Sequence, residues 1–410
     1  MSAPTPGLTP ETALERIRQA RERIAADIRP TPLIESAPFS ARTGRRVWLK
    51  LELLQRTGAF KVRGALNKIR CLSPEERGRG VLAASAGNHA QGVGLAAQLE
   101  GCPATIVMPR ATPVIKVERT KAFGAEVLLH GAHYEEAYDH AVEVAAERGA
   151  TMVHPFDDDD VICGQGTLGL ELQEELPDEV DTVVVPIGGG GLIAGVALAL
   201  RALRPELRIV GVQAEGANPM VLSFQKGEAV EIPLPRTLAD GIQVGRVGAR
   251  TWPLVRDYVD DCVQVSEDEI ADAMFYGLEQ TKIVAEGAGA AALAALLNDR
   301  VGDGRGVCVL QCGGNIDLSL MSRVIERGLT QAQRVRPLKL LTQDRPGVLQ
   351  DISRVLGEAG ANVLELDHHR AGWRLPIGYV ELEILIETRG ADHGLEVSKA
   401  VEAAGYSLLP

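Results

Sequence analysis

Short apolar runs alternate with longer segments of helical periodicity through the first three quarters of the chain. The apolar runs predict buried strands at residues 47–51, 81–84, 104–108, 126–129, 182–187, 209–213 and 307–311. Helices are expected from about residues 88, 113, 133 and 192, each directly after one of these runs. An earlier helix starts at Thr9-Pro10, an N-cap followed by proline at the first helical position. Apolar strands that alternate with helices predict a parallel, doubly wound α/β fold.

The pattern changes near residue 330. Beyond it we expect strands at 337–342, 362–367 and 378–386, helices at 347–358 and 393–403, and a final strand. That βαββαβ order in about 75 residues is typical of a ferredoxin-like module. We therefore expect a catalytic domain at 1–328, with a small subdomain at about 50–155 inserted in a larger one. A linker at 329–335 and a second domain at 336–410 would follow.

Composition excludes several classes of protein. The 410 residues are 45% hydrophobic and 24% charged, and the net charge of −12 argues against nucleic-acid binding. No apolar run reaches the roughly 18 residues of a membrane span, and no signal-peptide pattern opens the chain. The six cysteines form no Cys-x-x-Cys pair, so we expect a reduced, cytoplasmic protein without a disulfide framework or metal site. The acidic run Asp157 to Asp160 is expected to be a solvated loop rather than a metal site.

Four glycines, Gly188 to Gly191, lie between a predicted strand and a predicted helix. Such a run can be a tight packing loop. At the start of a helix, however, its backbone N–H groups also form a concave seat for phosphate. No Gly-Lys-Ser/Thr follows, and the spacing of a dinucleotide-binding loop is absent, so neither of those phosphate sites is indicated.

Lys61 lies between Phe60 and Val62, close to Gly58 and Gly64. An isolated lysine is ordinarily a surface residue. These apolar neighbours can exclude water from the amine, which lowers its pKa and makes it a nucleophile or a base. A reactive lysine together with a phosphate-sized glycine loop is what an enzyme that uses pyridoxal phosphate (PLP) requires.

Residues 85–89, Ser-Ala-Gly-Asn-His, follow the predicted strand at 81–84. Asn88 is a good N-cap, and a helix start with Ser85 and Asn88 is equally a place to bind a carboxylate. We favour a structural role for His89, because a single histidine is weak evidence of catalysis. All these motifs, and the Cys312 to Asn315 stretch, lie near strand-to-helix junctions, where ligands bind in such sheets.

Together these residues resemble the fold-type-II PLP enzymes, the tryptophan synthase β-like class of two doubly wound subdomains, and most closely the threonine ammonia-lyases. The resemblance covers about residues 8–330. It is carried by residues 57–65, 85–92, 164–167, 186–192, 239–241, 286–289 and 312–315. The tail resembles an ACT domain through residues 344–349 and 360–363.

The resemblance implies a role for each motif. Lys61 would hold PLP as a Schiff base and then act as the base at Cα, and Asn88 would bind the pyridine 3′-oxygen. The substrate would contact Ser85, Ala86, Gly87, Asn88 and His89. The remaining cofactor contacts would come from Phe60, Gly188, Gly189, Gly190, Gly191, Leu192, Gly241, Glu286, Cys312 and Gly313. A neutral Cys312 thiol against the pyridine nitrogen makes a weaker electron sink than a carboxylate would, which suits elimination.

The implied reaction is β-elimination of L-threonine to 2-oxobutanoate and ammonia, with a side activity that converts L-serine to pyruvate. One methyl group separates these substrates and is worth only ~1–3 kcal/mol in a pocket. Ala86 stands where racemases of this family have a second serine, so racemisation is disfavoured. The stretch 215–221 keeps only Glu215 of the cation site of those racemases. The alternatives are a serine or 3-hydroxyaspartate dehydratase or racemase, a β-replacement enzyme, and a regulatory protein with a silent PLP domain.

The tail has room for a single ACT module, and one module must pair with another. The resemblance therefore implies a homo-oligomer, a dimer or tetramer, with isoleucine or valine as the effector. A role in isoleucine biosynthesis and a catabolic role both stay open, because the dehydratases of isoleucine synthesis usually have a longer regulatory region. A tail that only assembles subunits is the alternative.

Overall fold

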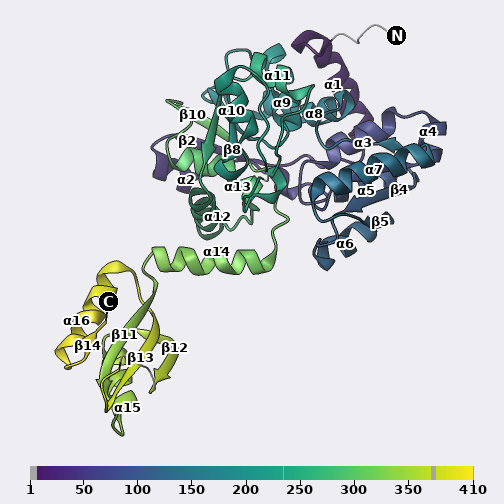
Figure 1. Cartoon of the computed structure of the whole chain (residues 1–410). Helices are drawn as coiled ribbons and strands as arrows, with labels where there is room; N and C mark the ends of the chain where they lie inside the picture. Colours follow the sequence, from purple (N-terminus) through teal and green to yellow (C-terminus); the bar gives the residue numbers. More distant parts are fainter. Residues whose placement is uncertain (1–6, 234, 371–374, 410) are drawn as a thin grey trace. The chain divides into compact units, whose positions relative to one another are not determined.

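In the computed structural model the chain divides into two compact units, residues 1–316 and 317–410. The structure describes residues 7–233, 235–370 and 375–409. The first unit contains two sheets, with the helices of the smaller one in blue and those of the larger one mainly in teal and green (Figure 1). The α/β fold with two doubly wound parts is confirmed.

The large sheet has six strands in the order β1-β2-β10-β7-β8-β9. They are β1 (Leu33–Glu35), β2 (Arg46–Lys50), β7 (Thr182–Pro186), β8 (Arg208–Ala214), β9 (Asp261–Val265) and β10 (Gly306–Leu310). Only the β1–β2 pair is antiparallel. All five residues of β7 and of β10 are buried, as their apolar sequences predict for central parallel strands.

The small sheet has four parallel strands in the order β5-β4-β3-β6. They are β3 (Val81–Ala84), β4 (Ala104–Met108), β5 (Glu126–Leu129) and β6 (Thr151–Met152). The helices near this sheet are α3 (Val62–Cys71), α4 (Pro74–Arg79), α5 (Asn88–Leu99), α6 (Val114–Lys121) and α7 (Tyr134–Arg148). Helix α3 contacts α5 as well as α8 (Asp159–Glu175), so it connects the small sheet with the rest of the unit.

The other helices of the first unit accompany the large sheet. They are α1 (Pro10–Ile24), α2 (Ala37–Thr43), α9 (Gly191–Leu203), α10 (Pro219–Lys226), α11 (Thr251–Tyr258), α12 (Glu267–Thr281) and α13 (Gly287–Leu297). Helices α8 and α9 approach closely because glycines meet: a Cβ on Gly195 would lie 2.6 Å from the backbone nitrogen of Gly166. Helices α9 and α13 both contact β7.

Each sheet reverses its strand order at one place, and loops that follow the strands there are suited to bind ligands. In the large sheet β7 leads outward to β8 and β9, whereas β10 lies on the other side of β7. In the small sheet β3 leads outward to β4 and β5, whereas β6 lies on the other side of β3. The loops that follow β3, β6, β7 and β10 are therefore where a site is expected.

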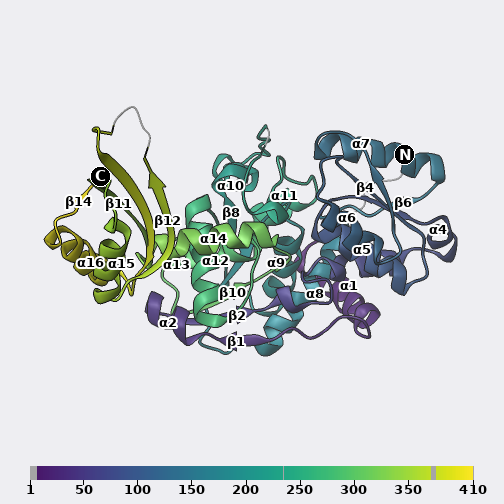
Figure 2. The same cartoon turned by 90° about the horizontal axis from the view of Figure 1, so that it is seen from below.

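The second unit contains α14 (Leu318–Gln331) and an antiparallel sheet in the order β12-β13-β11-β14. Its elements are β11 (Val335–Gln343), α15 (Val348–Glu358), β12 (Asn362–His369), β13 (Tyr379–Glu387), α16 (Ala391–Ala403) and β14 (Ser407–Leu408). Both α15 and α16 pack on one face of this sheet (Figure 2), around a core that includes Leu340, Ile352, Ile384 and Val397. The predicted βαββαβ order and its ferredoxin-like strand order are present.

The start of the expected linker differs from the sequence-based expectation. Residues 329–331 form the last turn of α14, because the helix is amphipathic and buries Met321, Val324 and Gly328. The boundary between the two units also falls at residue 316, twelve positions before residue 328, so α14 belongs to the second unit.

Candidate active site

Hydrogen bonds join the lysine-bearing segment to the loop after β10. The backbone nitrogen of Phe60 donates to the Cys312 carbonyl at 3.2 Å, and Ala59 forms a bridge with Gly313. The Asn315 side chain donates to the Thr57 carbonyl at 2.6 Å. These contacts bring together two motifs that lie about 250 positions apart.

Lys61 immediately precedes α3, and its side chain reaches the segment that follows β6. The Nζ donates to the Pro155 carbonyl at 2.9 Å. Loss of water lowers the pKa of Lys61 to about 8, although nearby Cys312 and Glu286 act in the opposite direction. Gly92 of α5 allows this close approach, because a Cβ there would lie 3.1 Å from the carbonyl carbon of Lys61. The expected desolvation of the amine is present in the geometry.

Asn88 is held by two side chains. Its Nδ2 donates to Glu286 Oε1 at 2.6 Å, and its Oδ1 accepts from Asn315 Nδ2 at 2.8 Å. The sequence suggested Asn88 as an N-cap; instead, Gly87 is the N-cap and Asn88 is the first residue of α5. The side chain therefore does not cap its own helix, and its orientation is fixed by residues from the large-sheet part of the unit.

Glu286 is buried, and it precedes α13 as its N-cap residue. Burial raises the pKa of Glu286 to about 7, and the nearby Asp240 also raises it, whereas the hydrogen bond from Asn88 lowers it. A Cβ on Gly313 would overlap Glu286 Oε1, and one on Gly241 would lie 3.2 Å from the same atom. The position of this carboxyl group therefore requires Gly313, whereas a Cβ on Gly241 would make only a tight contact with it.

The four-glycine run forms the turn from β7 into α9, and Gly190 has a positive φ of 97°. A Cβ on Gly189 would overlap the ring of Phe156, and a Cβ on Gly191 would lie 2.9 Å from the Phe156 Cα. The Thr251 hydroxyl donates to the Gly189 carbonyl at 2.6 Å. Leu192 follows in α9 and is buried. The run therefore starts a helix in the manner of a phosphate seat.

The loop after β3 and the first residues of α5 contain the residues that the sequence analysis assigned to the substrate. Ser85 Oγ accepts from the Gly87 backbone nitrogen at 3.2 Å, and Ala86 packs against the core of the small sheet. His89 is buried; its Nε2 lies 2.8 Å from the Val153 carbonyl, and its Nδ1 has no partner among the described residues. Burial lowers the pKa of His89 to about 3, so the ring is neutral at physiological pH. These contacts favour the structural role for His89.

Cys312 is buried, and its thiol donates to the Ala288 carbonyl at 3.5 Å. Burial raises the pKa of this thiol far above its usual range, and the charge of Glu286 raises it further. The side chain is therefore a neutral thiol, which is the state expected for a weak electron sink at the pyridine nitrogen.

Sequence reasoning missed the segment that follows β6. His154 Nδ1 accepts from the backbone nitrogens of Phe156 and Asp157, at 3.3 and 2.8 Å. The imidazole ring lies edge-on to Phe156, with centroids 4.6 Å apart. The same segment thus supplies the carbonyl that accepts from Lys61 and the ring that packs on the glycine run. The strand that precedes it, β6, has only two residues and was not among the predicted strands, so the sequence carried no local signal for this segment.

The acidic run 157–160 was expected to be a solvated loop, but its side chains are partly buried and have specific partners. Asp157 accepts from the backbone nitrogens of Ala249, Arg250 and Thr251 at the start of α11. Asp158 caps α8, and Asp160 pairs with Arg16 and Lys68. These carboxylates accept hydrogen bonds from the backbone N–H groups at the starts of two helices and pair with arginine and lysine side chains, which keeps the run close to the protein.

A buried ion-pair network around Arg63, two residues after Lys61, was also missed. Arg63 contacts both oxygens of Glu52, at 2.8 Å each, and pairs with Glu171 at 2.6 Å. Lys50 pairs with Glu171 at 2.9 Å and donates to the Thr31 carbonyl at 2.8 Å. The network ties the first turn of α3 to β2 and α8. Charged residues in otherwise apolar segments were the only signal in the sequence.

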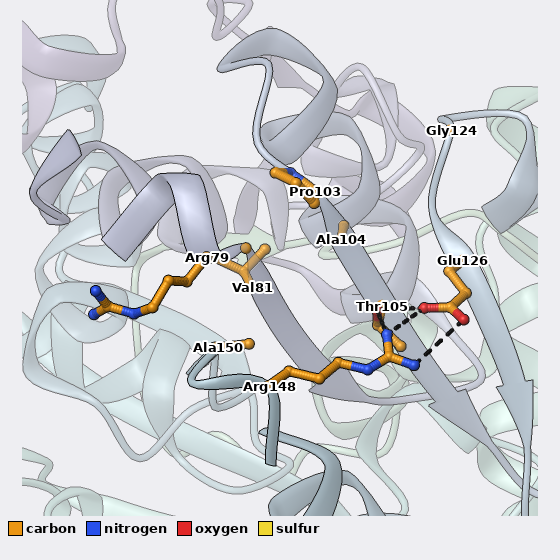
Figure 3. Close-up of a pocket in the computed structure, with 10 residues that line it drawn as sticks. Arg79, Val81, Pro103, Ala104, Thr105, Gly124, Glu126, Arg148 and Ala150 are labelled. Atoms are coloured by element: carbon orange, nitrogen blue, oxygen red, sulfur yellow. Dashed lines mark hydrogen bonds and ion pairs between the residues drawn. The ribbon is translucent and has the colours of Figure 1, made fainter. Parts of the chain in front are cut away.

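A separate hollow lies at the opposite edge of the small sheet, where its strands begin. Arg148 reaches across it to Glu126 and Thr105, with an Nη1 to Oε2 distance of 2.5 Å to Glu126 (Figure 3). The motif-bearing loops follow the other ends of these strands, so this hollow is not part of the candidate site. In the described ranges no group of three or more metal-ligating side chains occurs, and no helix there is long and apolar enough to cross a membrane.

The arrangement fits one cofactor. A partly desolvated lysine, a helix-initiating glycine run and an amide locked between two partners surround one region, and a neutral thiol lies at its wall. The family described as "Pyridoxal-phosphate dependent enzyme" matches residues 24–313. The chain belongs to this family. The predicted cofactor, pyridoxal phosphate, is thereby confirmed.

Relatives within the family are similar over nearly the whole chain. An L-threonine ammonia-lyase of Thermotoga maritima is 47% identical over 96% of this chain and 98% of its own length. An L-threonine ammonia-lyase of Geobacter sulfurreducens is 50% identical over 95% and 97%. The predicted resemblance to threonine ammonia-lyases is confirmed.

Solved structures are similar to about four fifths of the chain. Maize serine racemase is 40% identical, with a TM-score of 0.72 over 77% of this chain and 98% of that one. The processed threonine deaminase isoform 2 of Solanum lycopersicum is 35% identical, with a TM-score of 0.74 over 80% and 93%.

Proposed function

We propose that this PLP enzyme is an L-threonine ammonia-lyase that converts L-threonine to 2-oxobutanoate and ammonia. The observation that carries the proposal is the identity of 47–50%, over at least 95% of the chain, to two proteins of that name. The environment of Lys61 supports it, because burial lowers the pKa of the amine to about 8, so the neutral amine that can accept a proton is far more populated at neutral pH than in an ordinary lysine.

When bound, pyridoxal phosphate supplies an electron sink that makes the α-proton of an amino acid acidic. In the proposed mechanism the amine of Lys61 accepts that α-proton. The β-hydroxyl then leaves with a proton as water. The released enamine is hydrolysed by a second water molecule, so the net products of L-threonine are 2-oxobutanoate and ammonia. The backbone N–H groups of Gly188 to Gly191 and Leu192 would bind the phosphate, and Phe60 and Gly241 would line the cofactor site.

We assign the remaining roles from the contacts already described. Asn88 would direct its amide toward the 3′-oxygen of the cofactor while Glu286 and Asn315 hold it in place. Ser85 and the neighbouring backbone of Ala86, Gly87 and His89 would bind the substrate carboxylate. Cys312 would face the pyridine nitrogen as a neutral thiol, and Gly313 would leave room for Glu286.

The test is release of 2-oxobutanoate and ammonia from L-threonine by the PLP-loaded protein and by Lys61→Ala. Equal amounts of both products, lost in the variant, are expected. No product from threonine or serine, with the cofactor still bound, would overturn the proposal and direct attention to β-replacement or to 3-hydroxyaspartate.

L-Serine is proposed as a second, weaker substrate, giving pyruvate. Racemisation is a second candidate because a serine racemase is a structural neighbour, but Ala86 has no proton to offer to the opposite face of Cα. Chiral analysis of serine after incubation distinguishes the two reactions.

The second unit is proposed to be an ACT regulatory domain, at about residues 336–410. Its antiparallel βαββαβ fold supports this assignment. We further propose a cytoplasmic homo-oligomer, dimer or tetramer, regulated by isoleucine or valine and serving isoleucine synthesis. Activity and sedimentation measured with each amino acid would test the effector and the assembly.

A further inference from the structure

The Asp240–Ile242 turn lies over two parts of the candidate active site. A Cβ on Gly241 would lie 2.9 Å from the Ala288 Cβ and 3.7 Å from Asn88 Nδ2. On the other side, a Cβ on Gly188 would lie 3.3 Å from the Ile242 Cα. The backbone of this turn therefore contacts both the Asn88–Glu286 pair and the glycine run. A small displacement of the turn would disturb both.

The turn is short and partly exposed. Its own backbone hydrogen bonds run from Ile242 to Ala239 at 2.9 Å and from Gln243 to Asp240 at 3.2 Å. The Asp240 side chain is 54% exposed, and its carboxylate lies 2.6 Å from the Nζ of Lys116. Lys116 belongs to α6, which follows β4 of the small sheet. The ion pair thus spans the two sheet-bearing halves of the first unit.

Helix α6 is itself fixed to the helix that begins with Asn88. Val117 and Thr120 are the buried residues of α6. A Cβ on Gly94 of α5 would lie 3.2 Å from the Phe123 Cβ, just beyond α6. Contacts therefore form a closed ring: Asp240 to Lys116, α6 to α5, Asn88 to Glu286, and Glu286 back to the turn at Gly241.

We propose that Lys116 is a positioning residue, which holds the Asp240–Ile242 turn against the active site through its ion pair with Asp240. The role rests on the proposed lyase function, because the turn borders the residues assigned to the cofactor. Lys116 acts through Asp240 and Gly241 and takes no part in the chemical step.

The test compares Lys116→Gln, Asp240→Asn and the charge-reversed double variant Lys116→Asp with Asp240→Lys. Lys121→Gln is the matched control, because Lys121 lies on the same helix and pairs with Glu118 of that helix. Each single variant should lower kcat/KM for L-threonine by about two- to fivefold, as expected for a partly exposed ion pair. The reversed pair should recover most of this loss, and the effect should fade in about 1 M salt.

Amide hydrogen exchange gives a readout that does not depend on turnover. Peptides that cover residues 237–245 should exchange faster in Lys116→Gln than in the wild type, both with and without PLP, and the reversed pair should restore slow exchange. Unchanged exchange in Lys116→Gln, or a loss that charge reversal does not repair, would overturn the proposal. A wild-type protein that releases no 2-oxobutanoate refutes the lyase function instead, and the exchange comparison still decides the role of the ion pair.

Discussion

The side-chain amide of Asn88 donates to the buried carboxyl group of Glu286 over 2.6 Å, although 198 positions separate the two residues. One residue begins α5 beside the small sheet, and the other precedes α13 beside the large sheet. The orientation of the amide in the active site is therefore decided by a residue from the opposite wall.

At pH 8, where the Glu286 carboxyl group is ionised, Glu286→Ala should lower kcat/KM for L-threonine about 10- to 100-fold, because a hydrogen bond to a charged group contributes about 1.5–3 kcal/mol. Glu286→Gln should retain more activity than Glu286→Ala, since its carbonyl oxygen can still accept from Asn88. Steady-state kinetics of the two variants provide the measurement. Equal losses in both would show that Asn88 does not depend on this acceptor.

The raised pKa of Glu286 predicts a pH-dependent stability. The folded protein titrates this carboxyl at about 7 and the unfolded chain at about 4.5, so folding favours the protonated form. Its stabilising effect is complete below pH 4.5 and is lost as the pH rises through 7. Relative to wild type, Glu286→Gln should therefore gain about 2–3 kcal/mol in unfolding free energy between pH 4.5 and 7.5. Urea unfolding of the cofactor-free proteins would measure this gain, and a constant difference across the range would contradict it.

Gly313→Ala should abolish most activity, because the added methyl group would overlap Glu286 Oε1. We expect a loss of more than about 100-fold in kcat/KM as the carboxyl group and Asn88 move, on the scale of a misplaced catalytic group. Gly78→Ala is the control, since a Cβ at that helical glycine meets open space. A fully active Gly313→Ala enzyme would mean that the loop after β10 adapts freely.

Arg63→Met should destabilise the fold by about 3–5 kcal/mol, because it removes the ion-pair partner of the buried Glu52 and leaves Glu171 with Lys50 alone. Arg354→Met removes an exposed pair with Glu358 in the second unit and should cost less than about 1 kcal/mol. Urea unfolding monitored by circular dichroism compares the two. A cost at Arg63 no larger than that at Arg354 would show that the network contributes little.

Local sequence patterns predicted most of the fold and the motif residues. Strands such as β3 and β4 were predicted to the residue, because an apolar run ending in a polar turn is a local signal. The roles of Asp157 and Arg63 were not predicted, because their partners, at residues 249–251 and at 52 and 171, are distant in the chain. The partner of Asn88 was missed for the same reason: capping is a local rule, whereas Glu286 approaches only after both sheets have formed.

Strand β10 is the last strand of the first unit along the chain, yet it pairs with β2 on one side and β7 on the other. During translation, β2 and β7 therefore have no strand between them until residues 306–310 have left the ribosome. The segment that contains Lys61 likewise lacks its hydrogen-bond partners in the loop after β10 until residues 312–315 have emerged. Cofactor capture is thus expected to coincide with completion of the catalytic unit, so nascent chains that stop before β10 should not acquire the PLP absorbance.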